Sequence, residues 1–288
     1  WRYLIMRRST LKKYAKLIAK MGVNVRKGQE VIISAELDQP EFVELVVEEC
    51  YNAGAKKVTV EWTHQPVTLL NVNNRSLETL STVEKWEEEK IRHASEVLPA
   101  RIYLISEDPD GLNGMDQQKN AAARNARYKI LKPYSDAMEN RYQWCIAAVP
   151  GVKWAKKVFP GTSSTVAMKK MWDAILYTSR VIDKDGRALN PIKEWKAHNA
   201  NLHTKCEYLN NLGIVSLEYK SSNGTDFKVG MMDEGIFLGG EEQVLGKKRI
   251  WYNPNIPSEE VFITPKKGVA EGIVYSPKPL SYCGETIE

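Results

Sequence analysis

Short apolar runs alternate with amphipathic segments over the first half of the chain, and this alternation most limits the folds available to it. The run Val31–Ala35 and the alternating stretch Val58–Trp62 predict two buried strands. Between them a segment that begins at Pro40 carries apolar residues at helical spacing, namely Val43, Val46, Val47 and Cys50. Two strands joined by a helix predict a parallel βαβ unit whose sheet is covered by helices.

The alternation continues toward the middle of the chain. Helices are predicted over residues 11–22, near 81–97 and near 117–132, and strands at 101–105 and 142–149. Four strands with intervening helices indicate an α/β fold with an open, mostly parallel sheet. No phosphate-binding pattern of the type GxGxxG or GxxxxGKS/T follows any of these strands, so the sequence gives no support to nucleotide binding.

In the second half of the chain the sequence pattern changes from alternating strands and helices to helices followed by short β-like runs. Ser163 or Ser164 is expected to cap a helix with a broad apolar face, and another long helix is expected to begin at Pro191. Short β-like runs and turns follow. These patterns predict an α/β amino-terminal domain with a helical connection over residues 1–212 and a β-rich, α+β second domain over 213–288.

The composition is that of a soluble globular protein, with 43% hydrophobic and 27% charged residues in 288. The longest apolar runs are far below the ~20 residues of a membrane span, and no apolar signal-peptide core follows the basic start. The net charge of +5 arises from 41 basic and 36 acidic residues that are interleaved along the chain. We therefore expect neither a membrane nor a nucleic acid as a partner.

The cysteines form no metal-binding pattern. Cys50, Cys145, Cys206 and Cys283 are widely spaced without a CxxC pair, which favours a reducing compartment, and the cytoplasm is the expected location.

The histidines are spaced too far apart to act together. His198 and His203 lie five residues apart on one predicted helix, a rotation of about 140°, so they cannot share a metal as the pair in HExxH does. A structural or hydrogen-bonding role is favoured for both, and equally for His64 and His93.

An acidic loop follows the strand at 101–105. Its carboxylates, Glu107, Asp108 and Asp110, could bind a cation at the carboxyl end of a parallel strand, where ligands often bind. An ordinary acidic loop, with Pro109 as the turn former, is the favoured interpretation.

The stretch of residues 253–265 holds the most informative carboxylates in the sequence. Its prolines and asparagines predict a turn, and the run Val261–Ile263 predicts a strand after it. Adjacent residues on an extended chain point to opposite faces, so only one of Glu259 and Glu260 can face a given site. The alternative is a helix start with Ser258 as the N-cap.

This stretch, Asn-Pro-Asn-Ile-Pro-Ser-Glu-Glu-Val-Phe from Asn253, resembles the signature of the thermophilic aminopeptidase family, the aminopeptidase T and aminopeptidase S type metallopeptidases. Further likenesses lie at Gly28–Val31, Val158–Gly161, Met171–Ile175, Trp195, His198-Asn199, Thr225-Asp226 and Gly239-Gly240. The resemblance covers nearly the whole chain. It implies a homodimeric, metal-dependent exopeptidase that removes amino-terminal residues from peptide substrates.

The resemblance also implies two divalent metal ions, drawn from zinc, cobalt, manganese or magnesium, which would hold a water, lower its pKa and polarise the scissile carbonyl. It places the family's first metal-ligand glutamate on Glu260, with Glu259 as the fallback. The other ligands, a second glutamate, two histidines and an aspartate, and the active-site tyrosine are expected further along than this chain extends. The second domain is therefore expected to be incomplete, and the 288 residues alone to be inactive.

Two other functions stay open. A binding or oligomerisation scaffold without chemistry is one, because the chain alone holds no catalytic constellation. An iron dioxygenase is the other, because some proteins of related architecture use a similar scaffold for a mononuclear iron, and native iron would indicate it.

Overall fold

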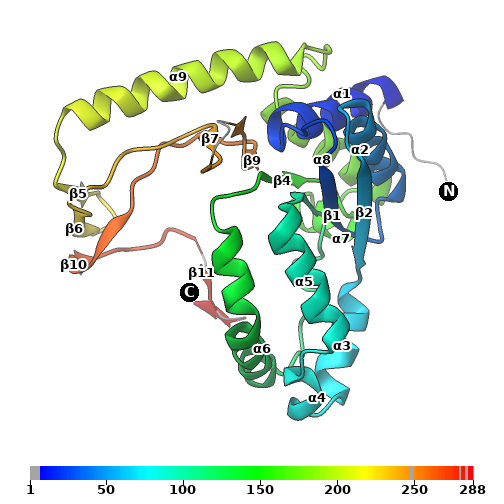
Figure 1. The fold of residues 1–288 in the computed structure, drawn as a ribbon. Helices are drawn as coiled ribbons and strands as arrows, with labels where there is room; N and C mark the ends of the chain where they lie inside the picture. Colours follow the sequence, from blue (N-terminus) through cyan, green and yellow to red (C-terminus); the bar gives the residue numbers. More distant parts are fainter. Residues whose placement is uncertain (1–6, 247–249, 279, 283–284, 288) are drawn as a thin grey trace. The chain divides into compact units, whose positions relative to one another are not determined.

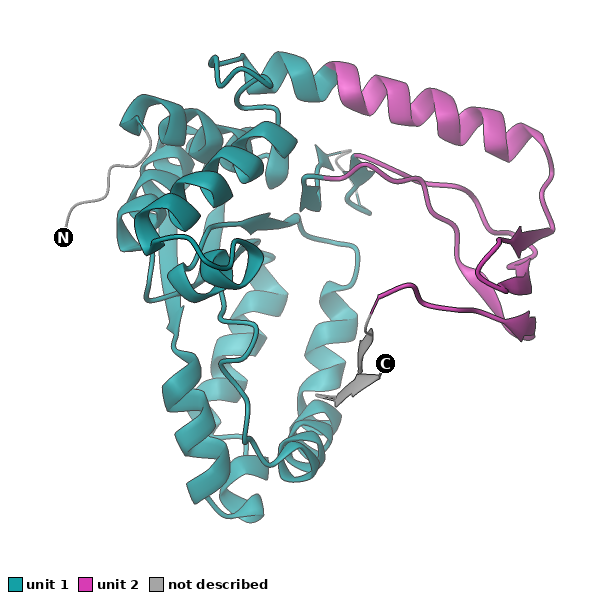
Figure 2. Cartoon of the chain, turned by 180° about the vertical axis from the view of Figure 1, so that it is seen from behind, with its two compact units in different colours: residues 1–196, 241–257 teal, residues 197–240, 258–288 magenta. Residues whose placement is uncertain are grey.

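A computed structural model describes residues 7–246, 250–278, 280–282 and 285–287. The chain divides into two compact units, which are coloured separately in Figure 2. Unit 1 comprises residues 1–196 and 241–257, and unit 2 comprises residues 197–240 and 258–288.

Unit 1 is built on a five-stranded sheet with the strand order β2-β1-β3-β4-β9 (Figure 1). The strands are β1 Glu30–Glu36, β2 Lys57–Thr63, β3 Ala100–Ile105, β4 Trp144–Ala148 and β9 Asn255–Ile256. All four pairings between neighbours are parallel. The predicted α/β fold with an open, mostly parallel sheet is therefore confirmed.

Helices connect these strands and supply the core. They are α1 Arg8–Leu17, a π-helical turn η1 Ile18–Gly22, α2 Pro40–Asn52, α3 Gln65–Asn74, α4 Leu77–Ser81, α5 Lys85–Val97, α6 Gln117–Met138, α7 Val152–Val158 and α8 Ser164–Thr178, with α9 Pro191–Asn211 beginning in this unit. The ring of Tyr14 in α1 stacks on Phe42 in α2 at 5.4 Å, and Phe42 meets Trp172 in α8 edge-on at 5.4 Å. One aromatic cluster thus joins three helices of the core.

Three predictions about these helices need correction. Helices α3 and α4 were not predicted, because their apolar residues form no clear face at helical spacing and only Val72 among them is buried. Helix α5 begins at Lys85, later than predicted, because Glu84 and Glu87 form a capping box. Helix α6 continues through Pro133 to Met138, past its predicted end at 132, since an interior proline removes one backbone hydrogen bond and does not always end a helix.

The cysteines that can be placed are buried free thiols, Cys50, Cys145 and Cys206, whereas Cys283 lies outside the described residues. Burial raises the pKa of Cys50 to about 12 and also raises that of Cys145.

At pH 8 we expect iodoacetamide to modify Cys50 at least about a thousandfold more slowly in the native protein than in denaturant, because the thiolate is the reactive form. Peptide mass mapping measures this difference, and labelling at the same rate in both states would contradict it.

Unit 2 contains the carboxyl-terminal part of α9 and an antiparallel sheet with the strand order β10-β6-β5. These strands are β5 Ser216–Lys220, β6 Asp226–Met231 and β10 Pro265–Ile273. Gly224, in the β5–β6 turn, has φ +94°, and a Cβ there would lie 3.1 Å from the ring of Tyr275, so glycine suits this turn. The β-rich character predicted after the α/β part is confirmed.

Shorter strands complete the two units. Strand β7, Glu242–Gln243, pairs with β8, Trp251–Tyr252, in unit 1, and β11, Leu280–Tyr282, pairs with β12, Glu285–Ile287, in unit 2. Among the residues placed in the structure, no helix has the length and apolar character needed to cross a membrane.

Residues 241–257 group with unit 1, a return that the texture of the sequence did not indicate. Strand β9 pairs with β4, and the backbone N–H of Asn253 donates to the carbonyl oxygens of Met21 and Gly22 at 2.8 and 2.9 Å. The predicted division into an α/β domain of residues 1–212 and a second domain of 213–288 stays a prediction.

Candidate metal site

The motif that begins at Asn253 starts inside unit 1. Asn253 is fully buried, and Ile256 in β9 is buried in the same core. The peptide bond between Ile256 and Pro257 is cis. Ser258 and the two glutamates after it belong to unit 2, so the motif's first half is core and its second half carries the candidate ligands.

Residues 258–261 are neither helical nor part of a strand. The alternative of a helix start with Ser258 as the N-cap is therefore wrong. Phe262 and Leu238 form an isolated antiparallel bridge, in which each backbone N–H donates to the other's carbonyl at 2.8 and 2.9 Å. Of the strand predicted at residues 261–263, the structure shows this one bridge, because Phe262 is the residue of the three that forms backbone hydrogen bonds with Leu238.

Two glycines lie against this segment and against α9. A Cβ on Gly239 would lie 2.6 Å from the carbonyl oxygen of Glu260, closer than real side chains approach. Gly240 has φ +77°, and its Cβ position is 3.0 Å from Oδ1 of the buried Asn199 on α9. The absence of side chains at both positions lets the backbone approach Glu260 on one side and the helix on the other.

His198 on α9 contacts the same turn. Its side chain is 8% exposed, and its Nε2 lies 2.6 Å from the carbonyl oxygen of Ser258 and 3.8 Å from Oε2 of Glu259. A carbonyl oxygen can only accept, so Nε2 carries a proton and donates it. The hydrogen-bonding role predicted for His198 is thereby confirmed, while the role of His203 stays a prediction.

Glu260, the predicted ligand, is an exposed residue. In the ranges that the structure covers, no group of three or more His, Cys, Asp or Glu side chains is arranged to hold a metal ion. Glu259 and Glu260 offer the oxygen donors that hard divalent cations accept, but these residues do not by themselves make a metal centre.

The acidic loop after β3 is compensated by lysines of α7. Asp108 pairs with Lys153 at 3.0 Å, and Asp110 pairs with Lys157 at 2.6 Å. Partial burial would raise the pKa of Asp108, but a hydrogen bond from the Asp110 amide and the Lys153 ammonium together hold that pKa below its usual value. The favoured interpretation of an ordinary acidic loop agrees with these contacts.

His64 and His93 each accompany one glutamate in unit 1. Nδ1 of His64 lies 4.0 Å from Oε2 of Glu36, and Nε2 of His93 lies 3.2 Å from Oε2 of Glu30. Each pair joins one histidine to one carboxylate, and no third His, Cys, Asp or Glu side chain in the described part of the chain completes a metal site with either pair.

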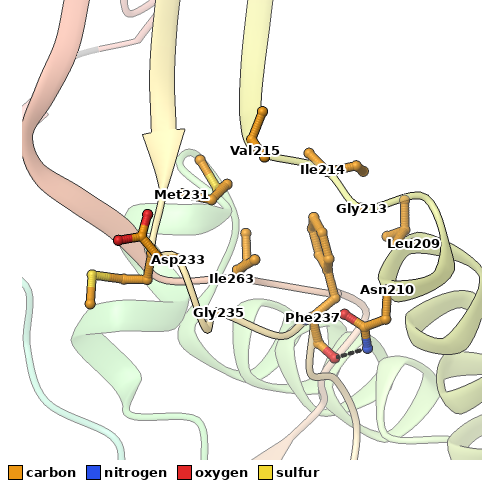
Figure 3. A pocket seen from close by; sticks show the side chains of 11 residues that line it. Leu209, Asn210, Gly213, Ile214, Val215, Met231, Asp233, Gly235, Phe237 and Ile263 are labelled. Atoms are coloured by element: carbon orange, nitrogen blue, oxygen red, sulfur yellow. Dashed lines mark hydrogen bonds between the residues drawn. The ribbon is translucent and has the colours of Figure 1, made fainter.

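Unit 2 also has two hollows. A cavity of about 210 Å³ lies where the end of α9 meets β6, and Figure 3 shows its lining side chains, with the Asn210 amide bonded to the carbonyl of Phe237. An apolar groove of about 580 Å³ runs over β5 and β6 and includes Val261 and Phe262. A nonpolar surface therefore adjoins the residues that follow Glu260.

The chain combines a parallel α/β unit, a smaller antiparallel unit and paired carboxylates after a proline-rich turn. A sequence profile described as thermophilic metalloprotease (M29) matches residues 7–288, and the chain belongs to this family.

The chain is similar to several aminopeptidases. Aminopeptidase AmpS of Bacillus subtilis (strain 168) is 34% identical over 280 residues, which are 96% of this chain and 66% of the relative. Aminopeptidase T of Thermus thermophilus is 33% identical over 279 residues, again 96% and 66%. The solved structure of wild-type AmpT from Thermus thermophilus matches with a TM-score of 0.83 and 32% identity, over 98% of this chain and 68% of that one. This chain thus spans about two thirds of the length of these relatives.

Proposed function

We propose that this chain is part of a metal-dependent aminopeptidase that removes amino-terminal residues from peptides. The observation that carries the proposal is the family match over residues 7–288, which includes the Glu259–Glu260 turn. Relatives named as aminopeptidases, at 33 and 34% identity over 96% of the chain, support the same activity.

Within this proposal, Glu260 is a metal ligand and Glu259 is not. Bound divalent ions would supply a Lewis acid and a water of lowered pKa. The residues of this chain would contribute the side chain of Glu260, on a backbone that lies against Gly239 and is held two residues later by the bridge at Phe262. Two ions, of zinc, cobalt, manganese or magnesium, a homodimeric assembly and a cytoplasmic location belong to the same proposal.

The test uses protein purified from its natural source, and intact mass and metal content are measured on one sample. We expect hydrolysis of a peptide with a free amino terminus, loss of that hydrolysis on chelation, and its recovery when metal is added back. The same peptide with an acetylated amino terminus is the matched control and should stay intact. Cleavage that is indifferent to chelation, or no cleavage by metal-loaded protein, would refute the proposal.

A verified chain of 288 residues should behave differently. We expect it to bind divalent metal weakly and to hydrolyse no peptide, because the residues placed in the structure provide no group of three ligands. Metal analysis after gel filtration and the same peptide assay check this expectation. Stoichiometric, tightly held metal together with hydrolysis would contradict it.

The same lack of three grouped metal ligands among the described residues favours a second candidate function for the isolated chain. This candidate is a scaffold that binds a partner and catalyses no reaction. A peptide with a free amino terminus that raises the melting temperature without being cleaved would support it, because ligands that bind only the native state stabilise that state by mass action. Native iron in place of zinc or cobalt would instead favour a dioxygenase.

A further inference from the structure

We propose that one face of the antiparallel sheet in unit 2 is the packing surface for a further layer of the polypeptide, supplied by the third of an M29 chain that lies outside the region matched here. This surface, the apolar face, is defined by Leu217 and Tyr219 of β5 and by Phe227, Val229 and Met231 of β6. Packing on the apolar face depends neither on the proposed metal ions nor on peptide hydrolysis.

The register of the strands places the nonpolar side chains together. Side chains alternate between the two faces of a strand, so residues that pair directly across two strands share a face. Leu217 pairs with Val229, and Tyr219 pairs with Phe227, whose ring lies 6.2 Å away. On β10, the small side chain of Ala270 pairs with Val229 on its other side. The apolar face is therefore continuous across the three strands.

The opposite face of the same sheet is charged. Glu218 pairs with Lys228 at 3.1 Å, and Lys220 lies 3.7 Å from Asp226. All four side chains are more than half exposed, as expected of residues in contact with water. An antiparallel sheet with this division exposes its charged side to solvent and packs its nonpolar side against a second layer.

The described residues of unit 2 leave the apolar face open. A groove of about 580 Å³ lies over it, and the described residues that line this groove include no charged side chain. Three of them, Tyr219, Phe262 and Val274, are 49, 44 and 62% exposed. In the described part of this unit the buried nonpolar side chains are Leu202, Cys206, Met231 and Phe237. So small a core leaves a unit of this size short of the apolar burial that a stable domain needs.

The length of the relatives identifies the occupant. This chain corresponds to 66% of aminopeptidase AmpS and to 66% of aminopeptidase T, so about a third of each relative lies outside the match. A segment of that size is long enough to form a complete layer of helices or strands. Because the groove is lined without charge, the side of that layer in contact with it should be nonpolar.

Photo-cross-linking from within the groove tests this packing. The variant Phe262→p-benzoylphenylalanine is made in the product of the complete gene, as a mixture of ¹⁵N-labelled and unlabelled chains. Phe262 is 44% exposed and the new residue keeps its benzyl group, so the fold should tolerate the change. We expect mass spectrometry to find cross-links from position 262 to peptides of the same chain that lie outside these 288 residues.

The matched control is Lys228→p-benzoylphenylalanine, on the charged face of the same sheet, where these cross-links should be lost. Cross-links from position 262 to residues 1–288 of the same chain would mean that the described units cover the apolar face themselves. Cross-links between labelled and unlabelled chains would mean that a second copy covers it. Either result would overturn the inference, as would equal cross-linking from both positions, no cross-linking from position 262, or a gene product of 288 residues.

This readout is separate from that of the proposed function. The cross-links are formed and detected without substrate or added metal, so protein that hydrolyses no peptide still tests the packing. Conversely, an active aminopeptidase with an open apolar face would refute the packing and leave the proposed function intact.

Discussion

In the metal-loaded protein isolated from its source, and under the proposed function, replacing Glu260 by glutamine should reduce both metal affinity and the hydrolysis of peptides by at least about 100-fold, the upper end of what loss of an outer partner costs a metal site. Glutamine has nearly the same shape but lacks the negative charge that holds a divalent cation. Glu260 is exposed, so the melting temperature of the metal-free protein should stay within the error of a surface substitution. Metal stoichiometry, kcat/KM and Tm measured on one preparation test all three expectations.

Glu271→Gln is the matched control, since it removes an exposed glutamate of β10 in the same unit. It should keep metal and activity. If Glu260→Gln retained full metal while Glu259→Gln lost it, the ligand would be Glu259 and not Glu260. Retention of metal by both single variants would remove this turn from the metal site altogether.

The parallel sheet of unit 1 could be predicted because its signal is local. Val31–Ala35 and Val58–Trp62 are apolar or alternating over several residues, and each strand that was found fills such a run. Strand β9 could not be predicted in this way, because Asn255–Ile256 is two residues long and pairs with a strand more than a hundred residues earlier. The pairing depends on where the chain returns, which periodicity does not record.

In the candidate site, too, the features set by neighbours in sequence could be predicted, and those set by distant residues could not. The turn and its two carboxylates follow from the prolines and asparagines around them, which act on their neighbours in sequence. The bond from His198 to Ser258 joins residues 60 apart, and spacing along the chain gave no sign of it. Gly239 and Asn199 were noticed only as family likenesses. In the sequence, Gly239 is one of two adjacent glycines and Asn199 is a polar residue on a predicted helix. Neither pattern indicates that Gly239 lies against Glu260 or that Asn199 lies against Gly240.

Trp195→Ala should cost about 3–5 kcal/mol of folding free energy, the usual range for a large aromatic residue lost from a core. Trp195 is fully buried in unit 1, and its indole Nε1–H donates to the carbonyl oxygen of Ser179 at 2.8 Å. Its ring also lies 5.6 Å from the Arg180 guanidinium. The substitution therefore leaves a cavity and removes the donor to a buried carbonyl. Urea unfolding followed by circular dichroism measures the change.

Two further variants separate the causes of that loss. Trp86 is 64% exposed, so Trp86→Ala should change stability by no more than about 0.5 kcal/mol. Trp195→Phe keeps an aromatic ring but loses the N–H donor, and we expect it to fall between the wild type and Trp195→Ala. A loss as large as that of Trp195→Ala would mean that the bond to Ser179 outweighs the volume of the ring. A loss close to zero would mean that the cavity alone sets the cost, and that packing, and not this bond, holds the start of α9 in unit 1.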